Sequence, residues 1–305
     1  MPGPDAWIES RSKPICDVPP LVFGSMPNDG GFLSDWDDGQ KRAVVEKFPS
    51  AVPLFRRFMG ATEFINNRVR WCLWLKDVSP AAIRAVQPVM EAVSNVREMR
   101  IASNRAGTRK LADYPTMFGE IRQPETDYLI VPRHSSENRK YIPLGYYHPD
   151  VICGDSCMVL PGATLYHFGV LTSSAHMAWM RVVAGRLEMR YRYSAAIVYN
   201  NFPWPSFAKA TEGKPDIDLC ASASLREKIS QTAQTILDVR ARYPDSSLAD
   251  LYDPLTMPAD LRAAHAANDR AVLAAYGLAA DTPEPEIVAH LFKLYAEMTN
   301  TNNEG

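Results

Sequence analysis

Proline sets the strongest limit on how this chain can fold. The 305 residues include 24 prolines, about 8% where roughly 5% is usual. Proline lacks the backbone donor that helix interiors and central strands need, so the chain must use many short elements joined by turns. After residue 206 the composition becomes helical, with Pro244, Pro254 and Pro258 separating the helical stretches. The sequence therefore predicts an α+β fold, with a β-rich mixed region followed by an α-helical region.

Local patterns predict where the elements lie. Residues 1 to about 40 carry a turn signal every few positions, so this segment needs a neighbour to pack against. A helix is expected to begin with Ser79 as its cap and Pro80 as its first residue, and to kink at Pro88. Short β-rich runs alternate with turns from about 111 to 205. The other expected elements are a helix at 38–48, a buried strand at 68–75, a short helix ended by Gly185, and amphipathic helices at 224–243, 257–277 and 284–298.

Composition excludes several classes of protein. Hydrophobic residues make up 46% and charged residues 22% of the chain, which is usual for a globular protein with a core. No apolar run reaches roughly 18 residues, and the N-terminus lacks a signal-peptide layout. We therefore expect a cytoplasmic protein with no membrane partner. Five scattered cysteines argue against a disulfide framework, and Cys153 with Cys157 lacks a second ligand pair for zinc, so we expect buried free thiols and no metal.

The charge is unevenly distributed, although the net value is only -2. The span from Arg97 to Arg192 holds 13 Lys/Arg and 9 Asp/Glu, so the centre is about +4 and the rest about -6. A basic centre favours an anionic partner. Solvated surface arginines explain the same distribution equally well.

The segment GRLEMRYRYS, residues 185–194, carries the most informative local pattern. If 187–193 forms a strand, Glu188, Arg190 and Arg192 share one face. The opposite, packable face then carries Met189, Tyr191 and Tyr193. Arginine suits bidentate contact with guanine, and glutamate accepts from cytosine N4. The ridge could therefore read a base pair, but an exposed strand face with an internal Glu–Arg pair also explains it.

Other stretches resemble catalytic sites only in part. Residues 201–204, NFPW, come within one residue of the Asn-Pro-Pro-aromatic loop with which DNA amino-methyltransferases hold a flipped base. Phe202 replaces the first proline, and no Gly-rich cofactor loop follows a strand, so we expect no catalytic role. A Ser–His hydrolase at Ser173 or Ser174, flanked by His167 and His176, would lack a nucleophile elbow and a clear acidic third member. The polar run at 135–143 suits either a phosphate or a plain turn.

Several long ordered blocks carry a family resemblance. Among them are SKPICDVPPLVFGSMPNDGGFL, SSENRKYIPLGYY and TLYHFGVLTSSAHMAWMRVVAGRLEMRYRYSAAIVYNNFPWP. From about Arg11 to Glu297 the chain resembles the C-terminal part of MmeI-like DNA methyltransferases. These restriction–modification proteins methylate adenine N6 with S-adenosylmethionine. The resemblance implies a connector from the methyltransferase domain at 1–94, a target-recognition domain at 95–205 and a helical C-terminal domain at 206–305. It also makes the NFPW stretch a structural closing motif.

The resemblance further implies sequence-specific binding of double-stranded DNA. The family's base-reading positions after Gly-Arg-Leu fall on Glu188, Arg190 and Arg192, and a further specificity position falls near Ser156. Contacts to the DNA backbone are expected from Arg139, Lys140 and Arg186. The family's cofactor motif and catalytic loop lie upstream and have no counterpart here. We therefore expect no cofactor in this chain, with S-adenosylmethionine belonging to the parent family.

Taken together, the sequence indicates the DNA-recognition part of an N6-adenine DNA methyltransferase, with no catalytic residues of its own. A separate chain carrying the catalytic domain is a possible second partner. The Met1 start suggests a split or truncated gene or a separate specificity polypeptide. Two alternatives stay open: a methyltransferase that is active alone, and a non-functional remnant.

Overall fold

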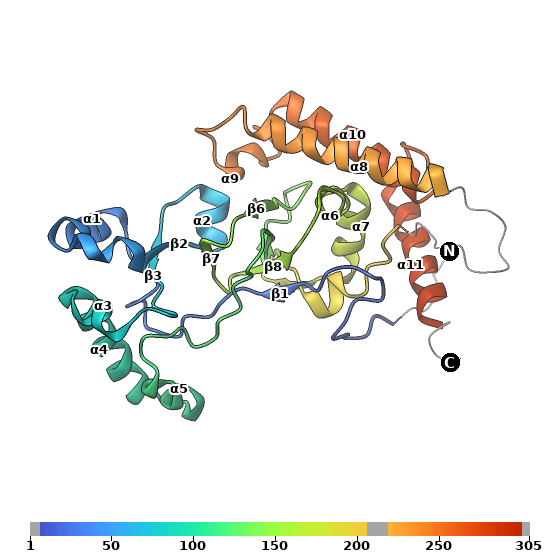
Figure 1. The fold of residues 1–305 in the computed structure, drawn as a ribbon. Helices are drawn as coiled ribbons and strands as arrows, with labels where there is room; N and C mark the ends of the chain where they lie inside the picture. The colour runs from blue at the N-terminus through green and yellow to red at the C-terminus, as the bar shows by residue number, and fades with distance from the viewer. Residues whose placement is uncertain (1–6, 206–218, 301–305) are drawn as a thin grey trace. The chain divides into compact units, whose positions relative to one another are not determined.

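The computed structural model describes residues 7–205 and 219–300, coloured along the chain in Figure 1. Two compact units emerge, and each combines segments that are far apart in the sequence. Unit 1 comprises Met1–Leu21, Val131–Gly145 and Leu160–Gly305, and unit 2 comprises Val22–Ile130 and Tyr146–Val159. Helices and strands occur in both, so the predicted α+β class is confirmed. The predicted domain boundaries near 95 and 206 concern the family's organisation and stay a prediction.

Two small sheets have most of their residues in unit 2. Their strands are β1 (Val22–Phe23), β2 (Phe55–Met59), β3 (Trp71–Leu73), β4 (Tyr128–Pro132), β6 (Gly145–Tyr147), β7 (Val151–Cys153) and β8 (Cys157–Pro161). Of these, β4, β6 and β8 each extend by one or two residues into the segments of unit 1. One sheet has the order β3-β2-β7, with β2 antiparallel to β3 and parallel to β7. The other has the order β1-β8-β4-β6. The strand expected at 68–75 is regular only at its centre, where Cys72 and Leu73 are fully buried.

The helices of unit 2 begin where side chains cap them. They are α1 (Asp38–Lys47), α2 (Ala61–Asn66), α3 (Pro80–Arg84), α4 (Gln87–Ile101) and α5 (Ala106–Lys110), with short 3₁₀ turns η1 (Pro49–Leu54) and η2 (Leu111–Asp113). Asp37 and Gln40 form a capping box at α1, which confirms the predicted helix. Ser79 caps α3 with Pro80 at its first position, as predicted. The expected kink at Pro88 is wrong: α3 ends, and Pro88 stands in the first turn of a separate helix, α4, where its missing N–H costs nothing.

A buried arginine ties the parts of unit 2 together. Arg100, at the end of α4, is fully buried. Its five N–H donors all reach backbone carbonyls, at 2.8–3.2 Å. The acceptors are the carbonyls of Pro27, Asn28, Leu111, Tyr114 and Met117. Because an arginine offers five donors in a fixed fork, this site holds two loops against α4 with every donor satisfied.

Unit 1 combines helices with a three-stranded sheet. Its elements are β5 (His134–Ser135), α6 (Leu165–Leu171), α7 (Ser174–Val183), β9 (Gly185–Leu187), β10 (Arg190–Arg192), a π-helical turn η3 (Ala195–Tyr199), α8 (Leu219–Arg240), α9 (Leu248–Leu251), α10 (Ala259–Ala275) and α11 (Glu284–Asn300). The short helix before Gly185 and the three later amphipathic helices are thus confirmed. α8 lies along α10 (Figure 1). Within the described ranges, no helix is long and apolar enough to cross a membrane.

Close backbone approach holds the helices of unit 1 together. The amide of Asn268, fully buried on α10, donates to the carbonyl of Gly169 on α6 at 2.8 Å and accepts from the Thr232 hydroxyl on α8 at 3.0 Å. A β-carbon at Gly169 would lie 2.7 Å from the Ile229 side chain. Glycine is therefore required where α6 meets α8.

The NFPW stretch closes this core. Asn201 and Phe202 are fully buried and Trp204 nearly so. The Asn201 amide donates to the carbonyls of Glu9, Ala196 and Ile197, and its side-chain oxygen accepts from Arg11. Both amide hydrogens are engaged, and the side-chain oxygen is buried and already accepts from Arg11, so the side chain is not open to a substrate amine. This geometry agrees with a structural closing motif.

Candidate nucleic-acid interface

The ridge picked out from the sequence lies on a β-hairpin in unit 1. β10 pairs antiparallel with β9 on one side and with β5 on the other. The expected single strand over 187–193 is therefore wrong in one respect: the chain turns at Glu188 and Met189 between two short strands. Arg190 and Arg192 still share one exposed face of β10.

The register adds a histidine to the arginine face. His134 on β5 stands opposite Arg192, and residues paired in this way project from the same face. Burial lowers the pKa of His134, and the nearby Arg133, Arg192 and Arg190 lower it further. Sequence reasoning missed His134, because its neighbour on the sheet lies far along the chain and no local pattern reports the pairing.

The opposite face of β10 is aromatic and packed. Tyr191 and Tyr193 are buried, as the alternation predicted. The Tyr193 hydroxyl lies 2.7 Å from Nε2 of His176 on α7, and burial lowers the pKa of His176 to about 3. Met189 was expected on this face, but it lies in the turn and is 67% exposed. The hairpin thus has one anchored face and one free face.

Glu188 stands at the tip of this hairpin in an unfavourable conformation. Its φ is 55°, a left-handed value that a residue with a β-carbon rarely adopts. Two-residue hairpin loops ordinarily place glycine, asparagine or aspartate at such positions. The Glu188 carboxylate pairs with the Arg190 guanidinium at 2.8 Å, and the two side chains are 72% and 57% exposed. The structure therefore brings two predicted base-reading residues together in solvent.

The three predicted backbone-contact residues have different surroundings. Lys140 is exposed, with its ammonium 5.2 Å from the ring centre of Tyr141. Arg139 is half-buried, and burial lowers its pKa while Asp253 opposes the change. Arg186 pairs with Tyr191 across the hairpin, so it lies on the face opposite Arg190 and Arg192. Lys140 and Arg186 are both exposed, but the Arg186 guanidinium also has protein partners.

The region around the hairpin is basic. The segments 131–145 and 185–193 contain six Lys/Arg and two Asp/Glu, a net charge of +4. All eight side chains belong to unit 1. A basic surface with arginines on one strand face is typical of nucleic-acid binding.

Ser156 belongs to unit 2, in the turn between β7 and β8. Its hydroxyl accepts from the backbone N–H of Ala61 at 2.9 Å, and the side chain is exposed. It borders a cavity of about 320 Å³ whose wall includes the ion pair of Glu63 with Arg70 at 3.3 Å. The Ser156 hydroxyl keeps its proton for a further partner, because it acts as the acceptor toward Ala61.

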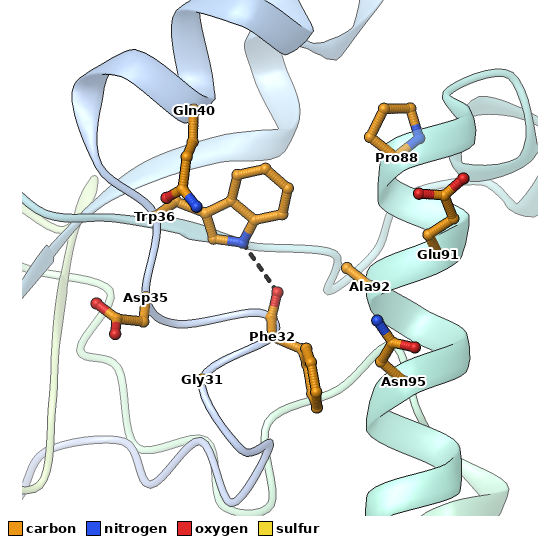
Figure 2. Close-up of a pocket in the computed structure, with 9 residues that line it drawn as sticks. All are labelled: Gly31, Phe32, Asp35, Trp36, Gln40, Pro88, Glu91, Ala92 and Asn95. Carbon is orange, nitrogen blue, oxygen red and sulfur yellow. Dashed lines mark hydrogen bonds between the residues drawn. The ribbon is translucent and has the colours of Figure 1, made fainter.

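A second pocket in unit 2 has the opposite character (Figure 2). It measures about 260 Å³ and lies between the loop at 31–36 and α4. Trp36 and Phe32 form one side, held by the bond from the Trp36 indole to the Phe32 carbonyl at 2.9 Å. Asp35 and Glu91 are the two acidic residues among those that line the pocket, and Figure 2 shows them on opposite sides, one on the loop and one on α4. Two carboxylates beside a pocket repel phosphate, so this pocket does not suit the DNA backbone.

The remaining motifs have structural roles. The Ser173 hydroxyl donates to the carbonyl of Val170 and accepts from the His176 N–H, so it caps α7 and is not poised as a nucleophile. Cys153 and Cys157 are buried and free, as expected. Among the residues that the structure describes, no group of three or more potential ligands is placed to hold a metal ion.

The fold and the hairpin define the class: an α+β protein with a basic strand face displayed beside a helical region. Comparison with known proteins gives the family. Residues 2–206 match the family described as MmeI, target recognition domain, and residues 221–302 match MmeI, C-terminal domain. The chain therefore belongs to the MmeI family, as the resemblance predicted.

Two relatives extend the comparison. DNA methyltransferase A of Bacillus subtilis (strain 168) is 38% identical over 301 residues, which cover 97% of this chain and 32% of that protein. The type IIL restriction–modification enzyme MmeI, solved in complex with DNA, is 40% identical with a TM-score of 0.89 over 98% of this chain and 38% of its own. The chain thus spans about a third of each relative's length.

Proposed function

We propose that this chain recognises a specific sequence of double-stranded DNA as the target-recognition part of an N6-adenine DNA methyltransferase of the restriction–modification type. Arg190, Arg192 and Glu188 contact base edges in the major groove, and Lys140 and Arg139 contact phosphates. Ser156, on unit 2, supplies a further base contact. The proposed place of action is the cytoplasm.

The conformation of Glu188 is the observation that carries this proposal. A glutamate at a left-handed position costs roughly 1–2 kcal/mol relative to glycine, and here its side chain gains only an exposed ion pair. An exposed pair returns about 0.2–1 kcal/mol. Local stability therefore does not account for the residue. A role for its carboxylate in contacting a base does, because strained residues gather at sites of function.

The arginines support the same role. Arg190 and Arg192 project from one face of a strand that is anchored from behind by Tyr191 and Tyr193. An anchored strand holds its exposed side chains in a fixed register, as discrimination between bases requires. The solved relative MmeI was captured with DNA, which supports DNA as the ligand.

We further propose that catalysis lies outside this chain. Asn201, the residue nearest in pattern to a catalytic loop, is fully buried, with its amide donors engaged and its oxygen accepting from Arg11, so it does not fit a methyl-transfer site. S-adenosylmethionine would then bind a methyltransferase domain, either in a partner chain or in a longer polypeptide. Calorimetry of this chain with S-adenosylmethionine tests the point, and saturable micromolar binding would contradict it.

Selection from a pool of random duplexes tests the recognition. The purified chain is incubated with the pool at two salt concentrations, and bound duplexes are sequenced. Enrichment of one sequence is the expected result. Weak, salt-sensitive binding without enrichment would contradict autonomous specificity, because phosphate contacts alone give that behaviour. It would leave two interpretations: specificity that needs the catalytic domain, or a non-functional remnant.

The selected site then allows a residue-level test. Replacing Arg190 with alanine should cost about 1–3 kcal/mol at one base pair and relax the preference there. An equal loss on every sequence would identify Arg190 as a phosphate contact instead.

A further inference from the structure

Arg186 is separated from the other arginines of the hairpin by the sheet itself. In the β9–β10 register it stands opposite Tyr191, whereas Arg190 stands opposite Leu187 and Arg192 opposite Gly185. Cross-strand partners share a face. Arg186 therefore lies on the aromatic face of the hairpin, behind the surface that carries the proposed base contacts.

Three contacts fix the Arg186 side chain there. Its guanidinium carbon lies 4.2 Å from the ring centre of Tyr191. One terminal nitrogen donates to the carbonyl of Met189, in the turn, at 3.3 Å. The same nitrogen lies 3.6 Å from the carboxylate of Glu137, in the turn after β5. One side chain thus joins the back of β10, the hairpin turn and the neighbouring loop.

We infer that Arg186 is a positioning residue that holds the Glu188–Met189 turn in the form needed for recognition. The inference rests on the proposed function of the ridge and deepens it. The turn lacks glycine and asparagine, and Glu188 is held at positive φ, so the chain needs something outside the turn to keep it closed. The bond from Arg186 to the Met189 carbonyl, braced by stacking on Tyr191, supplies that restraint.

This role differs from a phosphate contact in ways that can be measured. A phosphate contact needs positive charge, so lysine substitutes for arginine with modest loss. Positioning needs a planar guanidinium that stacks on Tyr191 while one of its nitrogens donates to the turn, so lysine fails. Loss of a phosphate contact lowers the slope of log affinity against log salt by about 0.9. Loss of a positioning residue leaves that slope unchanged and relaxes sequence preference.

The experiment compares the wild-type chain with R186K and R186A, and with K140A as a matched loss of one exposed charge. Amide hydrogen exchange is first measured without DNA over residues 185–193. Loss of a cation–π contact of this kind should speed exchange there by roughly two- to fivefold in R186K and R186A. K140A should leave exchange unchanged. Unaltered exchange in both Arg186 variants would overturn the inference, whether or not the chain binds a specific DNA sequence.

DNA selection and salt titration provide the second readout. R186K and R186A should lose preference at the same base pair as R190A, with the wild-type salt slope. K140A should keep the wild-type sequence preference and show a smaller slope of log affinity against log salt. A reduced slope with preference retained in R186A would overturn the inference and identify Arg186 as a phosphate contact. If the wild type itself enriches no sequence, the proposed function fails, and the exchange result still decides whether Arg186 holds the turn.

Discussion

Glycine at position 188 should make the hairpin more stable than alanine does, and both substitutions should make recognition worse. Glu188 has a φ of 55°, and such a conformation costs a residue with a β-carbon roughly 1–2 kcal/mol. Alanine at the same position keeps that strain and, like glycine, removes the carboxylate and its ion pair with Arg190. Comparing E188G with E188A therefore isolates the backbone term from the side-chain term.

The expected difference follows from two opposing effects. Glycine relieves the strain but loses about 0.4–1 kcal/mol through the greater freedom of the unfolded chain. The net gain of E188G over E188A is then about 0.5–1 kcal/mol, so the hairpin amides should exchange roughly two- to fivefold more slowly in E188G. Both variants should lose about 1–3 kcal/mol of discrimination at one base pair, because both lack the carboxylate.

The two readouts refute different parts of the reasoning. Equal exchange rates in E188G and E188A would mean that the turn stores no strain at position 188. Wild-type sequence preference in both variants would mean that the Glu188 carboxylate reads no base. Slower amide exchange in E188G than in E188A, together with a weaker DNA sequence preference in both variants, would support a glutamate that is retained for recognition at a local structural cost.

Three further predictions concern stability. R100K should lower the free energy of unfolding by about 3–5 kcal/mol in a urea titration, because lysine cannot reach the five carbonyls that Arg100 binds; a smaller loss than that of a surface R84K control would contradict it. G169A should cost about 1–3 kcal/mol by the clash with Ile229, and an unchanged urea midpoint would show that α6 can shift. Burial lowers the folded-state pKa of His176 to about 3, below its unfolded value of about 6.5. The unfolded state therefore binds the extra proton, and the free energy of unfolding falls as pH drops from about 6.5 toward 3, by up to about 1.4 kcal/mol per pH unit. If the free energy of unfolding depended on pH in H176Q as it does in the wild type, this prediction would be wrong.

Local sequence patterns predicted the positions of many of the helices. The helix at 38–47 has its capping residues beside it in the sequence, and Ser79 with Pro80 marks the start of α3. These signals act over three or four residues, so they do not depend on the tertiary contacts of the rest of the chain. The same holds for the amphipathic helices after residue 219, whose buried residues recur at helical spacing, as Ile229, Ala233 and Ile236 do in α8.

The arrangement of the candidate site was less accessible from sequence. Alternation correctly gave the exposed side of Arg190 and Arg192 and the buried side of Tyr191 and Tyr193. It missed the turn at Glu188, because the turn contains none of the residues that usually mark one. The pairing of β10 with β5, which brings in His134, is a long-range contact that no window of sequence encodes.

The hairpin separates the residues that hold it from those that would read DNA. Tyr191, Tyr193 and Arg186 lie on the packed face, where a change alters how the hairpin is held. Arg190 is 57% exposed, and its guanidinium pairs with the carboxylate of Glu188 at the tip of the same hairpin. Surface substitutions of this kind usually change stability by less than about 0.5 kcal/mol, whereas a base contact is worth about 1–3 kcal/mol of discrimination. Substitutions on the exposed face should therefore change which DNA sequence is preferred without unfolding the domain, and substitutions on the packed face should weaken every preference together.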